Sequence, residues 1–121
     1  MTEKEARREV LAFAYGERLK AELLAVGQLL DTIANLHGPE RGGALALFRT
    51  AIGAVAGNLR LAAKILGTEE LRGLDARLEL VEGFVRLVQM TAARRELSGL
   101  LSEITTVSSR AMAALRGMGL L

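Results

Sequence analysis

The chain lacks several residue types on which protein chemistry often depends. Its 121 residues include no cysteine, no tryptophan, one proline and one histidine, and aromatic residues make up only 3%. Without cysteine the chain can form neither a disulfide nor a thiolate nucleophile, and the redox compartment stays undetermined. With so few aromatic side chains, stacking of nucleic-acid bases is an unfavourable binding mode. The core must therefore be built from leucine, alanine, valine and isoleucine.

A strong charge of either sign is also missing. Sixteen lysines and arginines stand against 14 aspartates and glutamates, a formal net charge of +2, and the two signs alternate along the chain. Such alternation is typical of solvated helix faces. The first ten residues mix acidic with basic side chains, unlike the basic start of a signal peptide, so we expect no signal peptide and a cytoplasmic location. The length fits one domain over residues 1–121.

Helical periodicity is what the sequence has in abundance. Between Ala44 and Leu66, apolar residues recur in steps of three and four and so share one face of a helix. They are Leu45, Phe48, Ile52, Val55, Leu59, Ala62 and Leu66. A second apolar set beside them consists of Leu47, Ala51, Ala54, Leu61 and Ile65. Together they cover more than half of the circumference, so we expect a core helix with neighbours on at least two sides.

The same period elsewhere predicts an all-α fold, an up-down antiparallel bundle of about four long helices. We place them near residues 3–36, 40–66, 69–93 and 98–116. Thr2 and Glu5 form a capping box at the first start, and Gly38 with Pro39 ends the first helix. Gly67 suits the end of the second helix, and Thr68 suits the cap of the third.

Two features inside the helices need explanation. Gly16 and Gly27 within the first helix each cost up to about 1 kcal/mol relative to alanine, which indicates a close approach between helices. The apolar pattern also changes phase between Val88 and Leu97. We expect a turn within residues 93–99, with Ser98 and Gly99 as cap residues. The alternative is a single long helix, helices three and four fused and swapped between the chains of an oligomer.

Catalytic patterns are hard to find. His37 has no second histidine or carboxylate at metal-ligand spacing, and we expect it to cap the first helix or pack at the loop. Asp75, Glu79 and Glu82 lie one turn apart and could hold Mg²⁺ for phosphate hydrolysis, but a second acidic pair is missing. Glu82 is four residues before Arg86, the order of a surface ion pair. The sequence therefore predicts no enzymatic activity, no metal and no cofactor, with metal-dependent phosphate hydrolysis as the rival.

The apolar surplus favours association instead. A four-helix monomer cannot bury every apolar face, so we expect a non-enzymatic interaction or structural module in a homo-oligomer or a larger assembly, with coiled-coil-like contacts. The candidate interface residues are Gly53, Gly57, Met112, Leu115, Met118, Leu120 and Leu121. The first alternative is a nucleic-acid-associated oligomer that aligns basic doublets, Arg7, Arg8, Arg94 and Arg95. The second is a membrane-associated or integral helical protein, disfavoured because Arg49 and Arg60 flank the most apolar stretch.

Overall fold

The computed structural model of the chain describes residues 2–121. Its α-helices are α1 (Glu3–Ala34), α2 (Gly38–Leu66), α3 (Leu74–Arg86) and α4 (Met90–Gly117), and a short 3₁₀ helix, η1 (Glu69–Leu71), precedes α3. No strand occurs within these residues. The all-α fold predicted from the periodicity is therefore confirmed.

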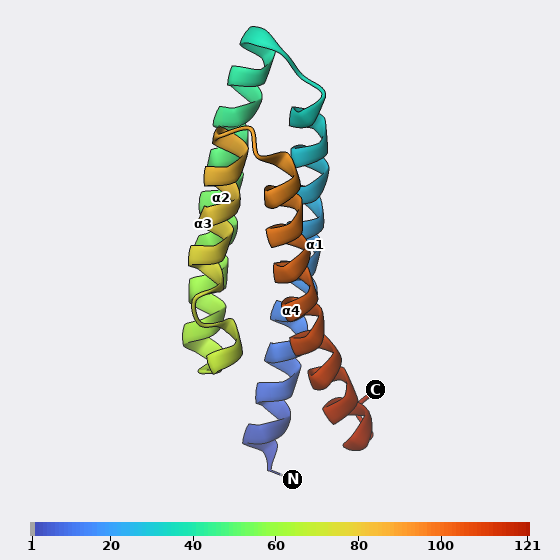
Figure 1. The fold of residues 1–121 in the computed structure, drawn as a ribbon. Helices are drawn as coiled ribbons and strands as arrows, with labels where there is room; N and C mark the ends of the chain where they lie inside the picture. Colours follow the sequence, from blue (N-terminus) through green and yellow to red (C-terminus); the bar gives the residue numbers. More distant parts are fainter. Residues whose placement is uncertain (1) are drawn as a thin grey trace.

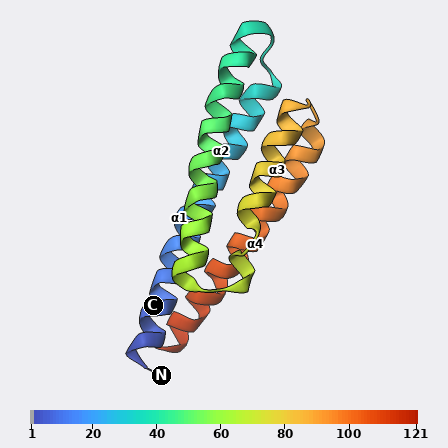
Figure 2. The same ribbon diagram turned by 90° about the vertical axis from the view of Figure 1, so that its left-hand side faces the viewer.

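The helices form an up-down bundle of two antiparallel hairpins. Helix α1 packs on α2 and α4, and α3 packs on the same two helices. The hairpins are offset along their length (Figures 1 and 2). The α1–α2 turn extends beyond the α3–α4 turn at one end, and the two chain termini extend together beyond η1 at the other. The bundle is thus four helices thick only in its middle, which leaves more helix surface in contact with solvent than an even bundle would.

On α2 the core follows the predicted face, except that Leu45 is only half-buried. The buried residues of α2 are Phe48, Ile52, Val55, Ala56, Leu59, Ala62 and Leu66. Those of α1 are Gly16, Leu19, Leu23, Val26, Leu30 and Ile33. Burial of each large aliphatic side chain is worth about 1.5–3 kcal/mol, so these two faces supply much of the stability of the bundle.

Helix ends on the first hairpin match most of the sequence signals. The Thr2 side chain accepts a hydrogen bond from the Glu5 amide at 3.1 Å. Gly67 ends α2 with a positive φ angle of 63°, which glycine adopts without the steric cost of a side chain. The expectation that Gly38 ends the first helix is wrong, because Asn35 is the C-cap of α1 and Gly38, with φ 62°, is the first residue of α2. Helix α1 ends at Ala34 and α2 begins at Gly38, each two residues earlier than expected.

The third helix begins later than predicted. We expected it from residue 69 with Thr68 as its cap, but η1 comes first and α3 starts only at Leu74. Thr68 makes no side-chain cap hydrogen bond, and its hydroxyl oxygen is buried with no partner among residues 2–121. Gly73, with φ 83°, makes the corner into α3.

The turn between α3 and α4 is also misplaced in the prediction. The chain reverses at residues 87–89, not 93–99, and it does turn, so the fused and swapped alternative is wrong for this chain. Val88 adopts the left-handed conformation at φ 61° and is 59% exposed. Ser98 and Gly99 lie inside α4 and cap nothing. A β-branched residue at positive φ gives no sequence signal for a turn, and this explains the error.

Candidate functional site

The face of α2 that points away from the bundle is apolar and uncovered. Helices α1 and α3 flank α2 on two sides, as expected, yet Leu47 remains 60% exposed and Leu61 49% exposed. The side chains between these leucines are small. We call this surface the α2 outer face, and it consists of Gly43, Leu47, Thr50, Ala54, Gly57 and Leu61. A row of leucines separated by small residues offers both projections and recesses to another helix.

Gly53 and Gly57, both candidate interface residues, have no other helix of the chain packed on them, although only Gly57 belongs to the α2 outer face. A Cβ atom added to Gly53 would meet no heavy atom within 4 Å, and one added to Gly57 would meet only Arg60 Nη2 at 4.0 Å. The two glycines therefore bring no helix of this chain close to α2. Their small size is unused within the monomer.

A groove of about 340 Å³ runs between α1 and α2 beside the outer face. Its walls are mainly alanine and aliphatic side chains, including Ala25, Leu29 and Ala51. At one end Asn58 Nδ2 donates to both carboxylate oxygens of Glu22 at 3.1 Å, and Arg18 Nε pairs with the same carboxylate at 3.0 Å. The groove extends the apolar surface of the α2 outer face toward α1.

On its other flank, α2 carries arginines that bind the acidic side chains of α3. Arg49 Nε donates to Glu82 Oε1 at 3.2 Å, and Arg60 Nη1 lies 3.3 Å from Asp75 Oδ2 and 3.8 Å from Glu79 Oε1. The expected ion pair between Glu82 and Arg86 is wrong, since Glu82 binds α2 instead. Asp75, Glu79 and Glu82, the three carboxylates considered above as a Mg²⁺ site, thus link α3 to α2.

Residues 2–121 contain no group of three or more histidine, cysteine, aspartate or glutamate side chains placed to hold a metal ion. His37 is exposed and precedes α2 at the N-cap position without a side-chain hydrogen bond, so the expected capping of the first helix is wrong.

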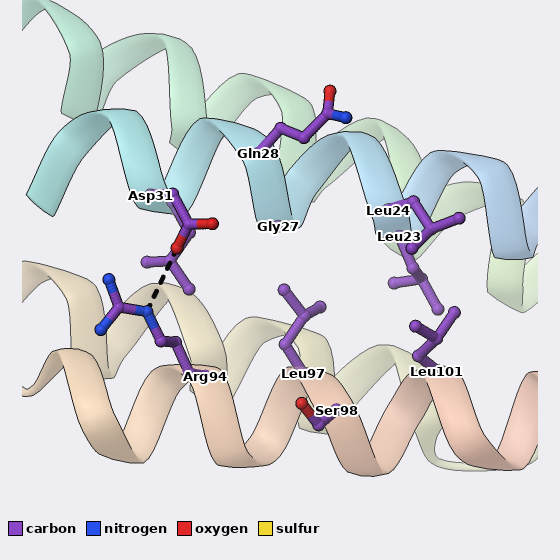
Figure 3. A pocket seen from close by; sticks show the side chains of 10 residues that line it. Leu23, Leu24, Gly27, Gln28, Asp31, Arg94, Leu97, Ser98 and Leu101 are labelled. Carbon is purple, nitrogen blue, oxygen red and sulfur yellow. Dashed lines mark hydrogen bonds and ion pairs between the residues drawn. The ribbon is translucent and has the colours of Figure 1, made fainter.

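A second groove, of about 430 Å³, lies between α1 and α4 (Figure 3). Leu23 and Leu24 line it from α1, and Leu97 and Leu101 line it from α4. Arg94 Nε donates to Asp31 Oδ1 at 3.2 Å across one end, as Figure 3 shows. The groove is apolar, its only close charges neutralise each other, and no paired nucleophile and base lie in it.

Two polar bridges that the sequence did not single out hold α4 in place. Ser108, buried on α4, donates its hydroxyl hydrogen to Glu17 Oε2 at 2.7 Å, and Lys20 Nζ lies 2.8 Å from the same oxygen. These bonds, first Lys20 and then Ser108, lower the pKa of Glu17. A serine within a helix gives no sign of whether it is exposed or buried. The hydrogen bond of Ser108 to a residue 91 positions away therefore could not be predicted from the sequence.

Arg77 of α3 makes the other bridge. Its Nε lies 2.7 Å from Glu96 Oε1, and its Nη1 lies 2.6 Å from Glu103 Oε1, both on α4. The hydrogen bonds to Glu96 and Glu103 raise the pKa of Arg77 above its ordinary value. Gly99 lies beneath the guanidinium, where an added Cβ would be 2.9 Å from Nη2. Gly99 therefore makes room for a side chain and does not serve as the turn residue predicted.

The candidate residues at the C-terminus divide into two kinds. Leu115 is buried and belongs to the monomer, while Met112 and Met118 are half-buried. Leu120 is 54% exposed and Leu121 62% exposed. The Leu120 amide donates to the Leu115 carbonyl at 2.9 Å, which folds the tail back toward the start of α1. Only the last two leucines offer a free apolar surface.

The basic doublets lie apart within one chain. Arg7 and Arg8 are in the first turns of α1, and Arg7 pairs with Glu3 at 3.7 Å. Arg94, with Arg95 next to it, pairs with Asp31, about 35 Å along α1 from Arg8 at 1.5 Å per residue. A basic stripe from these four residues therefore requires more than one chain.

No protein-family model matches the chain, and comparisons with curated proteins and with solved structures found no match either. The biochemical role must be inferred from the residues of the chain itself. Among residues 2–121, one helix, α2, is long and apolar enough to cross a membrane, with a mean hydropathy of 1.2 in its most apolar window. Core helices of globular proteins meet the same criterion.

Proposed function

We propose that the chain is a non-enzymatic helical module that self-associates, with the α2 outer face as its contact surface. The observation that carries this proposal is the exposure of Leu47 and Leu61 on either side of a run of small residues. Contiguous exposed apolar surface marks interaction sites more often than chance placement. Covering each half-exposed leucine would contribute about 1 kcal/mol to association.

The arrangement of charges supports the same role. The arginines nearest to the α2 outer face, Arg49 and Arg60, already bind carboxylates on α3. The face itself carries no charged side chain between Thr50 and Leu59. A partner that covers it does not have to remove an unpaired charge from water, which would cost several kcal/mol.

Sedimentation of the full chain, without detergent, tests the proposal. We expect the mass to rise from monomer to oligomer between low micromolar and millimolar concentration. Leu61→Glu should keep the chain monomeric throughout, because the new carboxylate would be buried on association. The matched control is Leu24→Glu, which places the same charge at a similarly exposed leucine in the α1–α4 groove and should still associate.

Other outcomes would favour the alternatives. A wild-type chain that stays monomeric at every concentration contradicts self-association. A chain that dissolves only in detergent would instead point to a membrane, with α2 in contact with lipid. A gel shift with DNA or RNA that weakens steeply with salt would favour the nucleic-acid alternative.

A further inference from the structure

We propose that two copies of the chain pair through their α2 outer faces, antiparallel, about a two-fold axis level with Ile52. This inference rests on the proposed self-association and specifies its geometry. It follows from three properties of α2: the order of large and small residues, the positions of its unpaired charges, and the length of the exposed face. The first two are complementary to themselves when one helix is reversed against the other, as a two-fold interface requires, and the third sets the expected affinity.

The first property is the order of large and small side chains, which is complementary between two antiparallel copies of α2. Leu47 stands as many residues before Ile52 as Gly57 stands after it, so antiparallel pairing places each Leu47 against Gly57 of the other copy. By the same symmetry Leu61 meets Gly43, and Thr50 meets Ala54. An added Cβ at Gly43 would meet no heavy atom within 4 Å, so the space over this glycine is open to an incoming leucine. Each large side chain therefore enters a recess.

Parallel pairing lacks this match. It would place Leu47 against Leu47 and Gly57 against Gly57, so the helices would be held apart at the leucines and leave gaps at the glycines. Such gaps weaken the van der Waals attraction between the helices, because the atoms that line a gap have no partner atoms in contact. With a glycine opposite each leucine, the helix axes can approach to the lower end of the usual range of about 8–10 Å.

The charges match in the same register. Glu40 and Lys64 stand equally far from Ile52, so each Glu40 lies beside Lys64 of the other copy at the two ends of the interface. Both side chains are exposed, and neither has an ion-pair partner in the part of the chain that the structure describes. A parallel pair would instead bring like charges together. Electrostatics and shape thus select the same orientation.

A second copy fits this face better than a lipid bilayer does. The face ends in opposite charges that a copy of itself neutralises, whereas a helix that spans hydrocarbon would place Arg49 inside the apolar core. From Glu40 to Lys64 the strip is about 36 Å long but only one helix wide, at 1.5 Å per residue and a helix diameter of about 10 Å. A strip so narrow buries less than the roughly 800 Å² per partner of a standard interface, so we expect a dimer of micromolar affinity.

Single cysteines test the geometry cleanly, because the native chain has none. Thr50 and Ala54 lie on the α2 outer face close to the proposed axis, and each faces the other residue of the partner copy. A mixture of Thr50→Cys and Ala54→Cys should form a disulfide-linked dimer that contains one of each under mild oxidation. Ser109→Cys, exposed on α4 and away from α2, is the matched control and should stay unlinked.

Orientation is read from the ends of the strip. Lys64→Cys alone should not link, because the two copies of residue 64 would be about 36 Å apart along the axis. Glu40→Cys alone should not link either, and a mixture of the two variants should give a dimer that contains one of each. Lys64→Cys linking with itself would establish a parallel pair and overturn the proposal.

Charge exchange gives an independent readout. Lys64→Glu should weaken dimerisation about two- to fivefold, as expected for an exposed ion pair at each end, and Glu40→Lys with Lys64→Glu should restore it. A chain that sediments as an oligomer but fails to link between Thr50→Cys and Ala54→Cys would overturn this geometry while leaving self-association standing. A chain that is monomeric at every concentration overturns both.

Discussion

Gly16 on α1 faces Ser108 on α4 at a contact that leaves no room for a side chain. A Cβ atom added to Gly16 would lie 2.9 Å from Ser108 Cβ and 3.1 Å from Ser108 Cα. Both of these atoms are attached to the backbone of α4, so the strain could be relieved only by moving the helix. The contact fixes the distance between the two helices that carry the chain termini.

Gly16→Ala should therefore destabilise the bundle. Alanine favours the helix by about 1 kcal/mol over glycine, but overpacking against a fixed neighbour costs about 1–3 kcal/mol, so we expect a net loss in the free energy of unfolding. The control is Gly83→Ala on α3, where an added Cβ meets no heavy atom within 4 Å and stability should rise. Urea denaturation of both variants measures the difference, and an equal gain in both would contradict the close contact.

Ser108→Ala should reduce stability in a pH-dependent way. Bonds from Lys20 and Ser108 lower the pKa of Glu17, so the folded chain favours the charged carboxylate. This contribution is present above the ordinary glutamate pKa of about 4.3 and is lost as the pH falls through the lowered folded pKa. The difference in stability between wild type and variant should be largest at neutral pH and shrink as the pH falls through the lowered folded pKa of Glu17. Ser109→Ala, an exposed neighbour, should show no such dependence.

Val88→Gly should stabilise the chain. Val88 closes the α3 turn with the Gln89 amide donating to the Phe84 carbonyl at 2.8 Å, and Gly119 closes α4 with the same bonding pattern. A left-handed residue with a side chain costs about 1–2 kcal/mol, and glycine avoids this cost. Part of the gain is lost because glycine also increases the conformational entropy of the unfolded chain. We expect the melting temperature to rise by a few degrees. A fall would mean that exposed Val88 packs on something beyond the monomer.

The sequence predicted the helices and the core because burial imposes a period that can be counted along the chain. The buried face of α2, from Phe48 to Leu66, is present in the spacing alone. The α3–α4 turn was not predicted at its true position because its left-handed residue is Val88, and valine is not typical of turns. Gly99 was wrongly predicted as a turn residue, because glycine suits a turn and equally suits a helix position that must leave space for the Arg77 guanidinium.

The candidate interface was foreseen only as a surplus of apolar residues. The spacing of apolar residues shows that α2 is apolar on more than half of its surface. It does not show which part of that surface α1 and α3 leave exposed. The offset of the two hairpins and the length of η1 decide this, and both depend on tertiary contacts. Leu115 illustrates the limit, because it was grouped with the exposed tail and is buried.

Arg77→Lys should weaken the attachment of α3 to α4. The guanidinium binds Glu96 and Glu103, two turns apart on α4, through separate nitrogens, and a single ammonium group cannot reach both. Because these side chains are partly exposed, we expect a loss of only about 1 kcal/mol, smaller in high salt. In a double-mutant cycle, Glu103→Gln should cost less stability in the Arg77→Lys background than in wild type. Equal costs in the two backgrounds would show that the bridge carries no coupling.

Thr68→Val should raise stability without changing the fold. The Thr68 hydroxyl is buried and has no hydrogen-bond partner within residues 2–121, so its desolvation is not compensated. Valine has nearly the same shape and removes that penalty, for an expected gain of about 1 kcal/mol in the free energy of unfolding. The comparison is Thr106→Val on α4, whose hydroxyl donates to the Ser102 carbonyl at 3.0 Å and is exposed, so no gain is expected there. If Thr68→Val instead loses stability, the hydroxyl makes a bond in solution, and Thr68 is a polar anchor of the α2–η1 corner.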